Sequence, residues 1–220
     1  MVQDIISKQI YLKPLLARYP HTTYERGERI VRPNDLTATI IFVKSGYVKI
    51  YRTSTNGKET TINIINSASY NALSFGLSTF IKKYSVSALT ETEVISIPRK
   101  DFLAFLDKNP EAYRELLTSL LRSLESMYGQ IEILKDGNAH IKIASIIYYL
   151  CKETGSKDKK SVKLGFRITH QMIANLTGLT RETVTVQLNK LKAKQYIEYE
   201  DNILKIKNVG ELEKLIRTEK

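Results

Sequence analysis

The stretch that decides the fold of the C-terminal part of the chain reads Ile168-Thr169-His170-Gln171-Met172-Ile173-Ala174-Asn175-Leu176-Thr177-Gly178-Leu179-Thr180-Arg181-Glu182-Thr183-Val184. Thr169 is suited to cap a short helix over residues 170–176, because a threonine hydroxyl can accept a bond from an otherwise unpaired helical N–H group. Thr180 is suited to cap a second helix that runs to about residue 194, and Gly178 centres a tight turn between them. Two helices joined by a glycine turn predict a helix-turn-helix unit, whose second helix enters the DNA major groove.

The spacing of apolar residues predicts which face of each helix is buried. The inward positions are Ile173, Leu176, Leu179, Val184, Leu188 and Leu191, and Ala174 is small where the two crossed helices must approach closely. A helix turns by about 100° per residue. The opposite face of the second helix therefore carries Glu182, Val186, Asn189 and Ala193, with Arg181 and Thr185 beside its N-terminal end.

These exposed side chains match the chemistry of base edges in duplex DNA. Arginine pairs with guanine, glutamate accepts from cytosine N4 and asparagine suits adenine, which gives roles to Arg181, Glu182 and Asn189. Val186 is apolar on a polar face, so it either contacts a thymine methyl group or is a surface valine without a role. The candidate DNA-binding set is Thr169, His170, Gln171, Thr180, Arg181, Glu182, Thr185, Val186, Asn189 and Lys192.

A small hairpin is expected directly after the second helix. Residues 195–199 and 203–207 read as its two strands, and Glu200-Asp201-Asn202 reads as its turn. Lysines surround this unit at positions 190, 192, 194, 205 and 207. They either neutralise DNA phosphates and position the helix or are simply solvated.

Composition limits the partners and the chemistry. The 220 residues include 34 Lys and Arg against 23 Asp and Glu, a formal net charge of +11. Residues 137–220 carry net +7, against +4 for residues 1–136, and such a surplus favours a polyanionic partner. The single cysteine, Cys151, excludes an intrachain disulfide or a Cys₄ zinc site, suits a reducing compartment and is expected to be a buried structural thiol. The apolar runs fall short of the ~20 residues of a membrane span, so we expect a cytoplasmic protein.

Residues 20–100 read as a series of short strands. Residues 40–43, 47–51, 60–65 and 93–97 are rich in β-branched and aromatic side chains, and the first two runs are separated by Ser45-Gly46. Asn56-Gly57 between the second and third runs predicts a hairpin, because both residue types accept positive φ. Many short strands with regular turns predict a β barrel or sandwich.

A long helix is expected from Asn109-Pro110 to Asp136. Its apolar residues follow one another at alternating intervals of four and three, which is the heptad pattern of a coiled coil; they are Tyr113, Leu117, Leu120, Leu124, Met127, Ile131 and Leu134. Leu116 and Leu121 lie off this heptad seam. Either the helix packs only on its own sheet, or it faces both its own domain and a second subunit, which we favour.

Between the long helix and the helix-turn-helix, one more helix is expected over residues 139–153, with Ile143, Ile146, Ile147 and Leu150 on its buried side. Residues 154–161 are expected to form a polar loop, since they are rich in glycine, serine and lysine. Its lysines, together with Lys163, either are solvated or touch a phosphate backbone.

The chain resembles the Crp/Fnr-type bacterial transcription regulators over nearly its whole length. The resemblance rests on the helix-turn-helix residues quoted above and on Glu25-Arg26-Gly27-Glu28, Phe42-Val43-Lys44-Ser45-Gly46 and Asn56-Gly57-Lys58-Glu59. It implies an α+β protein with a cyclic-nucleotide-binding-like β-roll (residues 1–108, with short flanking helices), a dimerisation helix (109–136) and a winged helix-turn-helix domain (137–220). It further implies a homodimer, double-stranded DNA and RNA polymerase as partners, and an effector site in the roll.

The effector site departs from that of the cyclic-AMP-binding members. Their phosphate-binding segment has Gly-Glu and Arg-Ser pairs, where this chain has Asn71-Ala72-Leu73-Ser74 and, later, Lys82-Lys83. Met127 and Tyr128 replace a Thr-Ser pair on the long helix. These departures argue against cyclic AMP, although Lys82 and Lys83 can hold another anion or form a solvated pair. The cysteine cluster of the iron–sulfur branch and the sensor histidine of the haem branch are missing, so the sequence identifies no cofactor and leaves a possible small-molecule effector unknown. Many relatives have an arginine in place of Val186.

Two other classes of function were weighed against a dimeric DNA-binding regulator. An effector-binding adaptor without DNA activity is disfavoured by the Thr180-Arg181-Glu182 motif. An enzyme is disfavoured because the sequence has no nucleophile–base pair, metal-ligand cluster or phosphate-binding glycine loop.

Overall fold

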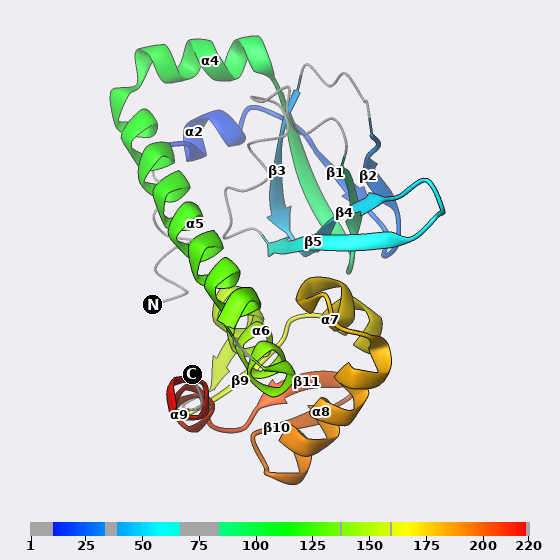
Figure 1. The fold of residues 1–220 in the computed structure, drawn as a ribbon. Coiled ribbons are helices and arrows are strands. Elements are labelled where there is room, and N and C mark those ends of the chain that lie inside the picture. Colours follow the sequence, from blue (N-terminus) through cyan, green and yellow to red (C-terminus); the bar gives the residue numbers. More distant parts are fainter. Residues whose placement is uncertain (1–10, 34–38, 67–83, 137, 159, 219–220) are drawn as a thin grey trace. The chain divides into compact units, whose positions relative to one another are not determined.

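The computed structural model describes residues 11–33, 39–66, 84–136, 138–158 and 160–218. They form two compact units (Figure 1). The first contains most of the residues up to 126 and the second most of those from 127 onward. Of the helices in the described ranges, none is long and apolar enough to traverse a bilayer. The expected α+β class and β-roll are confirmed.

The first unit contains two antiparallel sheets. One has the strand order β1 (His21–Tyr24), β7 (Thr92–Pro98), β3 (Thr39–Ser45), and the other the order β2 (Arg29–Val31), β6 (Ser85–Ala88), β4 (Tyr47–Thr53), β5 (Glu59–Asn66). Buried valines and isoleucines from both sheets form one apolar cluster, which makes the pair of sheets a roll.

Strand β3 contains an unbroken apolar run over residues 40–43, and the packing on its two faces explains why. Side chains alternate between the two faces of a strand. Ile41 and Val43 point into the interior of the roll, whereas Ile40 and Phe42 point to a second cluster on the other face. The sheet is therefore buried on both faces, and each position of the run must be apolar.

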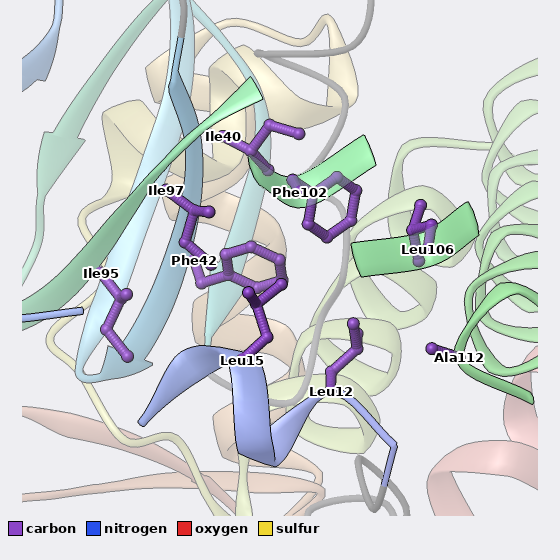
Figure 2. Close-up of a cluster of buried hydrophobic side chains, with 9 residues drawn as sticks. All are labelled: Leu12, Leu15, Ile40, Phe42, Ile95, Ile97, Phe102, Leu106 and Ala112. Atoms are coloured by element: carbon purple, nitrogen blue, oxygen red, sulfur yellow. The ribbon is translucent and has the colours of Figure 1, made fainter. Parts of the chain in front are cut away.

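The second cluster attaches helices to the roll (Figure 2). Helices α2 (Lys13–Leu16) and α4 (Arg99–Lys108) cover β3 and β7, and the Phe42 and Phe102 rings lie 5.8 Å apart at a tilted angle. Ala112 joins this cluster from the next helix, α5 (Pro110–Asp136). The roll thereby fixes the start of the long helix.

The heptad seam of α5 is left exposed by the described residues. Its seven residues are 39–63% exposed. Leu116 packs against the roll cluster, as expected for an edge that faces its own domain, but Leu121 is exposed, so the second edge is shorter than predicted.

The described part of the second unit combines the end of α5 and four complete helices with a four-stranded antiparallel sheet. Helix α6 (Ala139–Thr154) is capped by Asn138, whose Oδ1 accepts from Ile141 N at 3.0 Å. The sheet order is β10 (Ile197–Glu200), β11 (Ile203–Ile206), β9 (Ser161–Lys163), β8 (Ser156–Asp158). The remaining helices are α7 (His170–Thr177), α8 (Arg181–Ala193) and α9 (Val209–Thr218).

The prediction of a polar loop over residues 154–161 was wrong, because β8 and β9 pair there as a hairpin. Gly155 permits the sharp change from α6 into this hairpin. A Cβ atom at that position would collide with Val162 Cγ1 and with the Cys151 carbonyl oxygen. The pairing of β9 with β11 then ties the hairpin to the rest of the sheet.

Two glycines turn the chain between strands in different ways. Gly46 (φ +85°) passes the chain from one sheet of the roll to the other, because β3 and β4 belong to different sheets. Gly57 (φ +79°) lies in the predicted β4–β5 hairpin. Asn56 does not use positive φ there; its side-chain Oδ1 instead accepts from Lys58 N at 3.3 Å.

Replacing each of these glycines by alanine should lower the free energy of unfolding, by different amounts at the two positions. Gly57→Ala meets no neighbouring atom, so it should cost only the left-handed strain of about 1–2 kcal/mol. Gly46→Ala has a similar φ, but its Cβ would lie 2.8 Å from Thr92 Cα and would overlap the Glu91 carbonyl oxygen. We expect a loss of about 3 kcal/mol or more, since backbone must move. Urea unfolding followed by circular dichroism measures both, and equal losses would contradict the steric argument.

Candidate nucleic-acid interface

Side-chain caps define both helices of the predicted helix-turn-helix. Thr169 Oγ1 accepts from Met172 N at 3.1 Å at the start of α7, and Thr180 Oγ1 accepts from Thr183 N at 3.2 Å at the start of α8. Gly178 ends α7 with φ +70°, a conformation that most residues avoid. The two caps and the glycine turn confirm the local structure expected from the sequence.

The packing of the two helices agrees with the predicted rotation. Ile173, Ala174 and Leu176 of α7 are buried, as are Val184, Leu188 and Leu191 of α8. Leu179, predicted to point inward, is only half-buried. Because one side of α8 is fixed in the core, its opposite side must face outward.

That outer face carries most of the predicted base-reading residues. Arg181, Glu182, Asn189 and Lys192 are exposed, and so is Val186, at 52%. Val186 therefore leaves apolar surface in contact with water at the middle of a polar face, and burial of that surface against a partner would be favourable.

Thr185 and His170 contact each other instead of projecting freely. The Thr185 hydroxyl donates to the Arg181 carbonyl at 2.9 Å and lies 2.8 Å from His170 Nδ1. Since the hydroxyl proton is already engaged, His170 Nδ1 must be the donor of the second bond. Both residues are half-buried and link α7 to the first turn of α8. Gln171 is exposed, and its Nε2 donates to Asn175 Oδ1 at 3.0 Å.

A second histidine contacts α8 on the side away from its exposed face, and the sequence analysis did not predict this contact. His140 Nδ1 of α6 lies 3.0 Å from Gln187 Oε1 of α8, and among the described residues its buried Nε2 has no partner. Gln187 follows Val184 by three positions and so lies on the same side of α8. The spacing of three residues from Val184 could have shown that Gln187 faces the protein interior, but it could not identify His140 on α6 as the partner.

The hairpin of β10 and β11, here called the wing, has a two-residue turn in which both residues adopt left-handed φ values. Asp201 has φ +53° and Asn202 has φ +62°, and Glu200 pairs with Ile203 across the turn. Asparagine and aspartate tolerate this region best after glycine. The predicted hairpin is confirmed, and its register places Glu198 opposite Lys205.

Not all lysines of the unit are available to phosphates. Lys205 lies 3.3 Å from Glu200 and 3.5 Å from Glu198, and Lys163, opposite Lys205 on β9, lies 3.6 Å from Glu200 and 3.5 Å from Asp201. The hydrogen bond with Glu200 raises the pKa of Lys205. Like charges opposite each other destabilise a sheet, so these acids offset a local repulsion. Lys205 is therefore less available to contact a DNA phosphate than the sequence suggested.

The remaining lysines differ among themselves. Lys207 donates to Gln195 Oε1, whereas Lys190, Lys192 and Lys194 at the end of α8 are exposed and form no ion pair within the described part of the chain. Among these lysines, the positive charge that is open to a partner therefore lies at the end of α8 and at Lys207, and not at Lys205 or Lys163.

The predicted effector residues Asn71, Ala72, Leu73, Ser74, Lys82 and Lys83 lie outside the described residues. Met127 and Tyr128 are exposed on α5. The described interior of the roll is lined by eight valine and isoleucine residues around a void of about 10 Å³, the size of a single water molecule. This part of the roll is a packed core.

Cys151 is buried, as expected, and burial raises the pKa of its thiol to about 12. It is therefore an unreactive thiol at neutral pH. Among the described residues, no three His, Cys, Asp or Glu side chains are grouped to hold a metal ion.

Comparisons with known proteins agree with this architecture. A cyclic nucleotide-binding domain model matches residues 21–109, and a Crp-like helix-turn-helix domain model matches residues 141–215. The chain is 29% identical over 209 residues, 90% of each chain, to the global nitrogen regulator of Nostoc sp. (strain PCC 7120). It is 24% identical over 202 residues to the cyclic AMP receptor protein of Thermus thermophilus, covering 91% of this chain and 89% of that one.

A solved structure shows the same fold. FixK2 from Bradyrhizobium japonicum superposes with a TM-score of 0.74 at 17% identity, over 90% of this chain and 96% of the other. The two domain models occur in the order of the two units, and the curated relatives extend across both. The chain therefore belongs to the Crp/Fnr-type transcription regulators.

Proposed function

We propose that the protein is a homodimeric, sequence-specific DNA-binding transcription regulator in which α8 reads bases in the major groove. One observation carries the proposal: burial of Val184, Leu188 and Leu191 leaves Arg181, Glu182, Val186 and Asn189 exposed together on one helix face. Base edges in the major groove supply a partner for each of these side chains.

The individual roles follow from chemistry and position. Arg181 can bond both acceptors of guanine, Glu182 can accept from cytosine N4, and Asn189 suits adenine. Val186 is assigned to a thymine methyl group, which would bury its exposed surface. Thr169, His170, Gln171 and Thr180 lie at helix starts and Lys192 near the end of α8; we assign them to phosphates and to positioning, with Thr185 held by His170.

Dimerisation through the α5 seam would place two such helices on one duplex. A dimer of this kind reads half-sites about one helical turn apart, roughly 34–36 Å. Tyr113, Leu117, Leu120, Leu124, Met127, Ile131 and Leu134 are the proposed contacts. The seam supports this because its exposed apolar surface would otherwise contact water.

The proposal extends to parts of the chain for which family resemblance is the main support. It retains the division into a sensor (1–108), a dimerisation helix (109–136) and a DNA-binding domain (137–220). The sensor would respond to a small molecule other than cyclic AMP by shifting the dimer between two arrangements. Met127 and Tyr128, with the six residues of the phosphate-binding segment, are its proposed contacts. RNA polymerase would be a further partner, the protein would act in the cytoplasm, and no catalysed reaction is involved.

Removing Arg181 should distinguish specific from nonspecific binding. Arg181→Ala is expected to weaken binding to the specific site by about 1–3 kcal/mol, because one bidentate guanine contact is lost, while binding to random DNA changes little. Gel shifts on genomic fragments and on random duplexes measure both. Lys214→Ala on the exposed side of α9 is the matched control. An equal loss on both kinds of DNA would refute a base contact.

The role of Val186 can be tested from the DNA side. Replacing the contacted thymine by deoxyuridine removes one methyl group and should weaken binding by about 0.8 kcal/mol. In the Val186→Ala protein the same replacement should have no effect, since the partner surface is gone. The experiment replaces each thymine of the half-site in turn. If wild type and variant respond alike at every position, Val186 does not contact a thymine.

The seam predicts the oligomeric state. Leu124→Glu brings a buried negative charge into the interface from both subunits, which should weaken the dimer by about 3–5 kcal/mol. Thr118→Glu, on the outer side of the same helix, is the control. Light scattering at micromolar protein is expected to give a monomer mass for the first variant and a dimer mass for the second. A dimer in both cases would show that the subunits meet elsewhere.

A further inference from the structure

The second unit contains a cavity of about 490 Å³ that the proposed function does not use. Its lining comes from the second half of α6, from β9, from the end of β11 and from the start of α9. These elements belong to one compact unit, and α9 packs on α6 (Figure 1). None of the lining residues belongs to α7 or α8. The volume lies within the usual range of small-molecule sites, about 300–1,000 Å³.

The inner wall of this cavity is apolar. Cys151, Val162 and Ile206 line it and are buried, and Val209 is half-buried beside them. The Cys151 thiol remains uncharged because burial raises its pKa to about 12. An occupant must therefore present an uncharged hydrocarbon surface to this wall.

The rim of the cavity is cationic. Lys152 and Lys160 line it and are exposed, and none of the described lining residues is acidic. Glu213 of α9 bonds the lining residue Tyr148, and its charge is already engaged in an ion pair with Arg217 at 2.6 Å. The two lysines thus leave a net positive charge at the opening.

The start of α9 does not supply donors for an anion. Val209 N donates to the Lys160 carbonyl at 3.1 Å, and Asn208 Oδ1 accepts from Gly210 N at 3.1 Å and from Glu211 N at 3.3 Å. With these amides engaged inside the protein, recognition of a negative charge falls to the lysine side chains.

We propose that this cavity binds a small apolar monocarboxylate, with its hydrocarbon part against Cys151, Val162 and Ile206 and its carboxylate between Lys152 and Lys160. An apolar wall beneath two cations matches an amphipathic anion, whereas a nucleotide or a sugar would leave polar groups without partners on that wall. The occupant would contact α6, the sheet and α9 at once and would stabilise the unit that carries the helix-turn-helix.

Calorimetric titration of the full-length protein with octanoate tests the proposal, with 1-octanol as the uncharged control. We expect one octanoate per chain and at least about fivefold weaker binding of octanol, which corresponds to one exposed ion pair. Lys152→Met and Lys160→Met should each weaken octanoate binding by a similar factor, since methionine keeps an apolar stem. Lys214→Met should leave it unchanged. These lysines are exposed, so their replacement should not prevent folding.

A variant that fills the cavity locates the site. A Cβ atom at Gly210 would approach only Asn208 Oδ1, at 3.6 Å, so Gly210→Ala should bind octanoate like the wild type. Gly210→Leu adds a side chain at the opening and should reduce octanoate affinity at least tenfold without changing binding to DNA. Equal affinities for octanoate and octanol, an unaltered affinity in Gly210→Leu, or the absence of binding would each overturn the proposal.

Discussion

The burial of Val184, Leu188 and Leu191 fixes the rotation of α8 about its axis, and the candidate DNA interface depends on that rotation. Three apolar positions on one side of a helix leave only one face for solvent. Polar contacts then restrain the helix further: His170 bonds Thr185 near its start and His140 meets Gln187 at its middle. The exposed face is thus held by a core and by two hydrogen bonds to neighbouring helices.

Among the described residues, the long helix α5, unlike α8, is packed in an apolar cluster of its own unit only near its beginning. Ala112 and Leu116 anchor its beginning to the roll, through the cluster that also holds Phe42 and Phe102. Beyond that anchor its heptad seam is exposed in the single chain. A helix anchored at one end, with an apolar stripe along the rest, can connect a sensor to a second subunit. In the proposed dimer the stripe would supply the hydrophobic driving force for association, and the anchor would hold its first residues close to the roll.

Local signals in the sequence were sufficient for the helix caps, the glycine turn, the wing turn and the extent of the long helix. Thr169, Gly178 and Thr180 act within four residues of their partners, so their roles can be read from the chain alone. The wing register even places Glu198 against Lys205 and could have revealed that ion pair. The β8–β9 hairpin was missed, because its strands are three residues each and polar, and its stability comes from pairing with distant β11. The His140–Gln187 contact and the cavity beside α9 likewise join elements far apart in sequence.

Two side chains on the outer face of α8 occupy positions that helix electrostatics and hydrophobic burial disfavour. A cation at a helix N-terminus opposes the helix dipole, yet Arg181 is the first residue of α8 and forms no ion pair within the described residues. Val186 exposes an apolar surface on the same face. By contrast Lys190 and Lys192 lie in the last turn, where the dipole favours them, so their charge has a structural explanation. Departures without a local benefit mark functional positions more strongly than charge alone, and here they support the base contacts proposed for Arg181 and Val186.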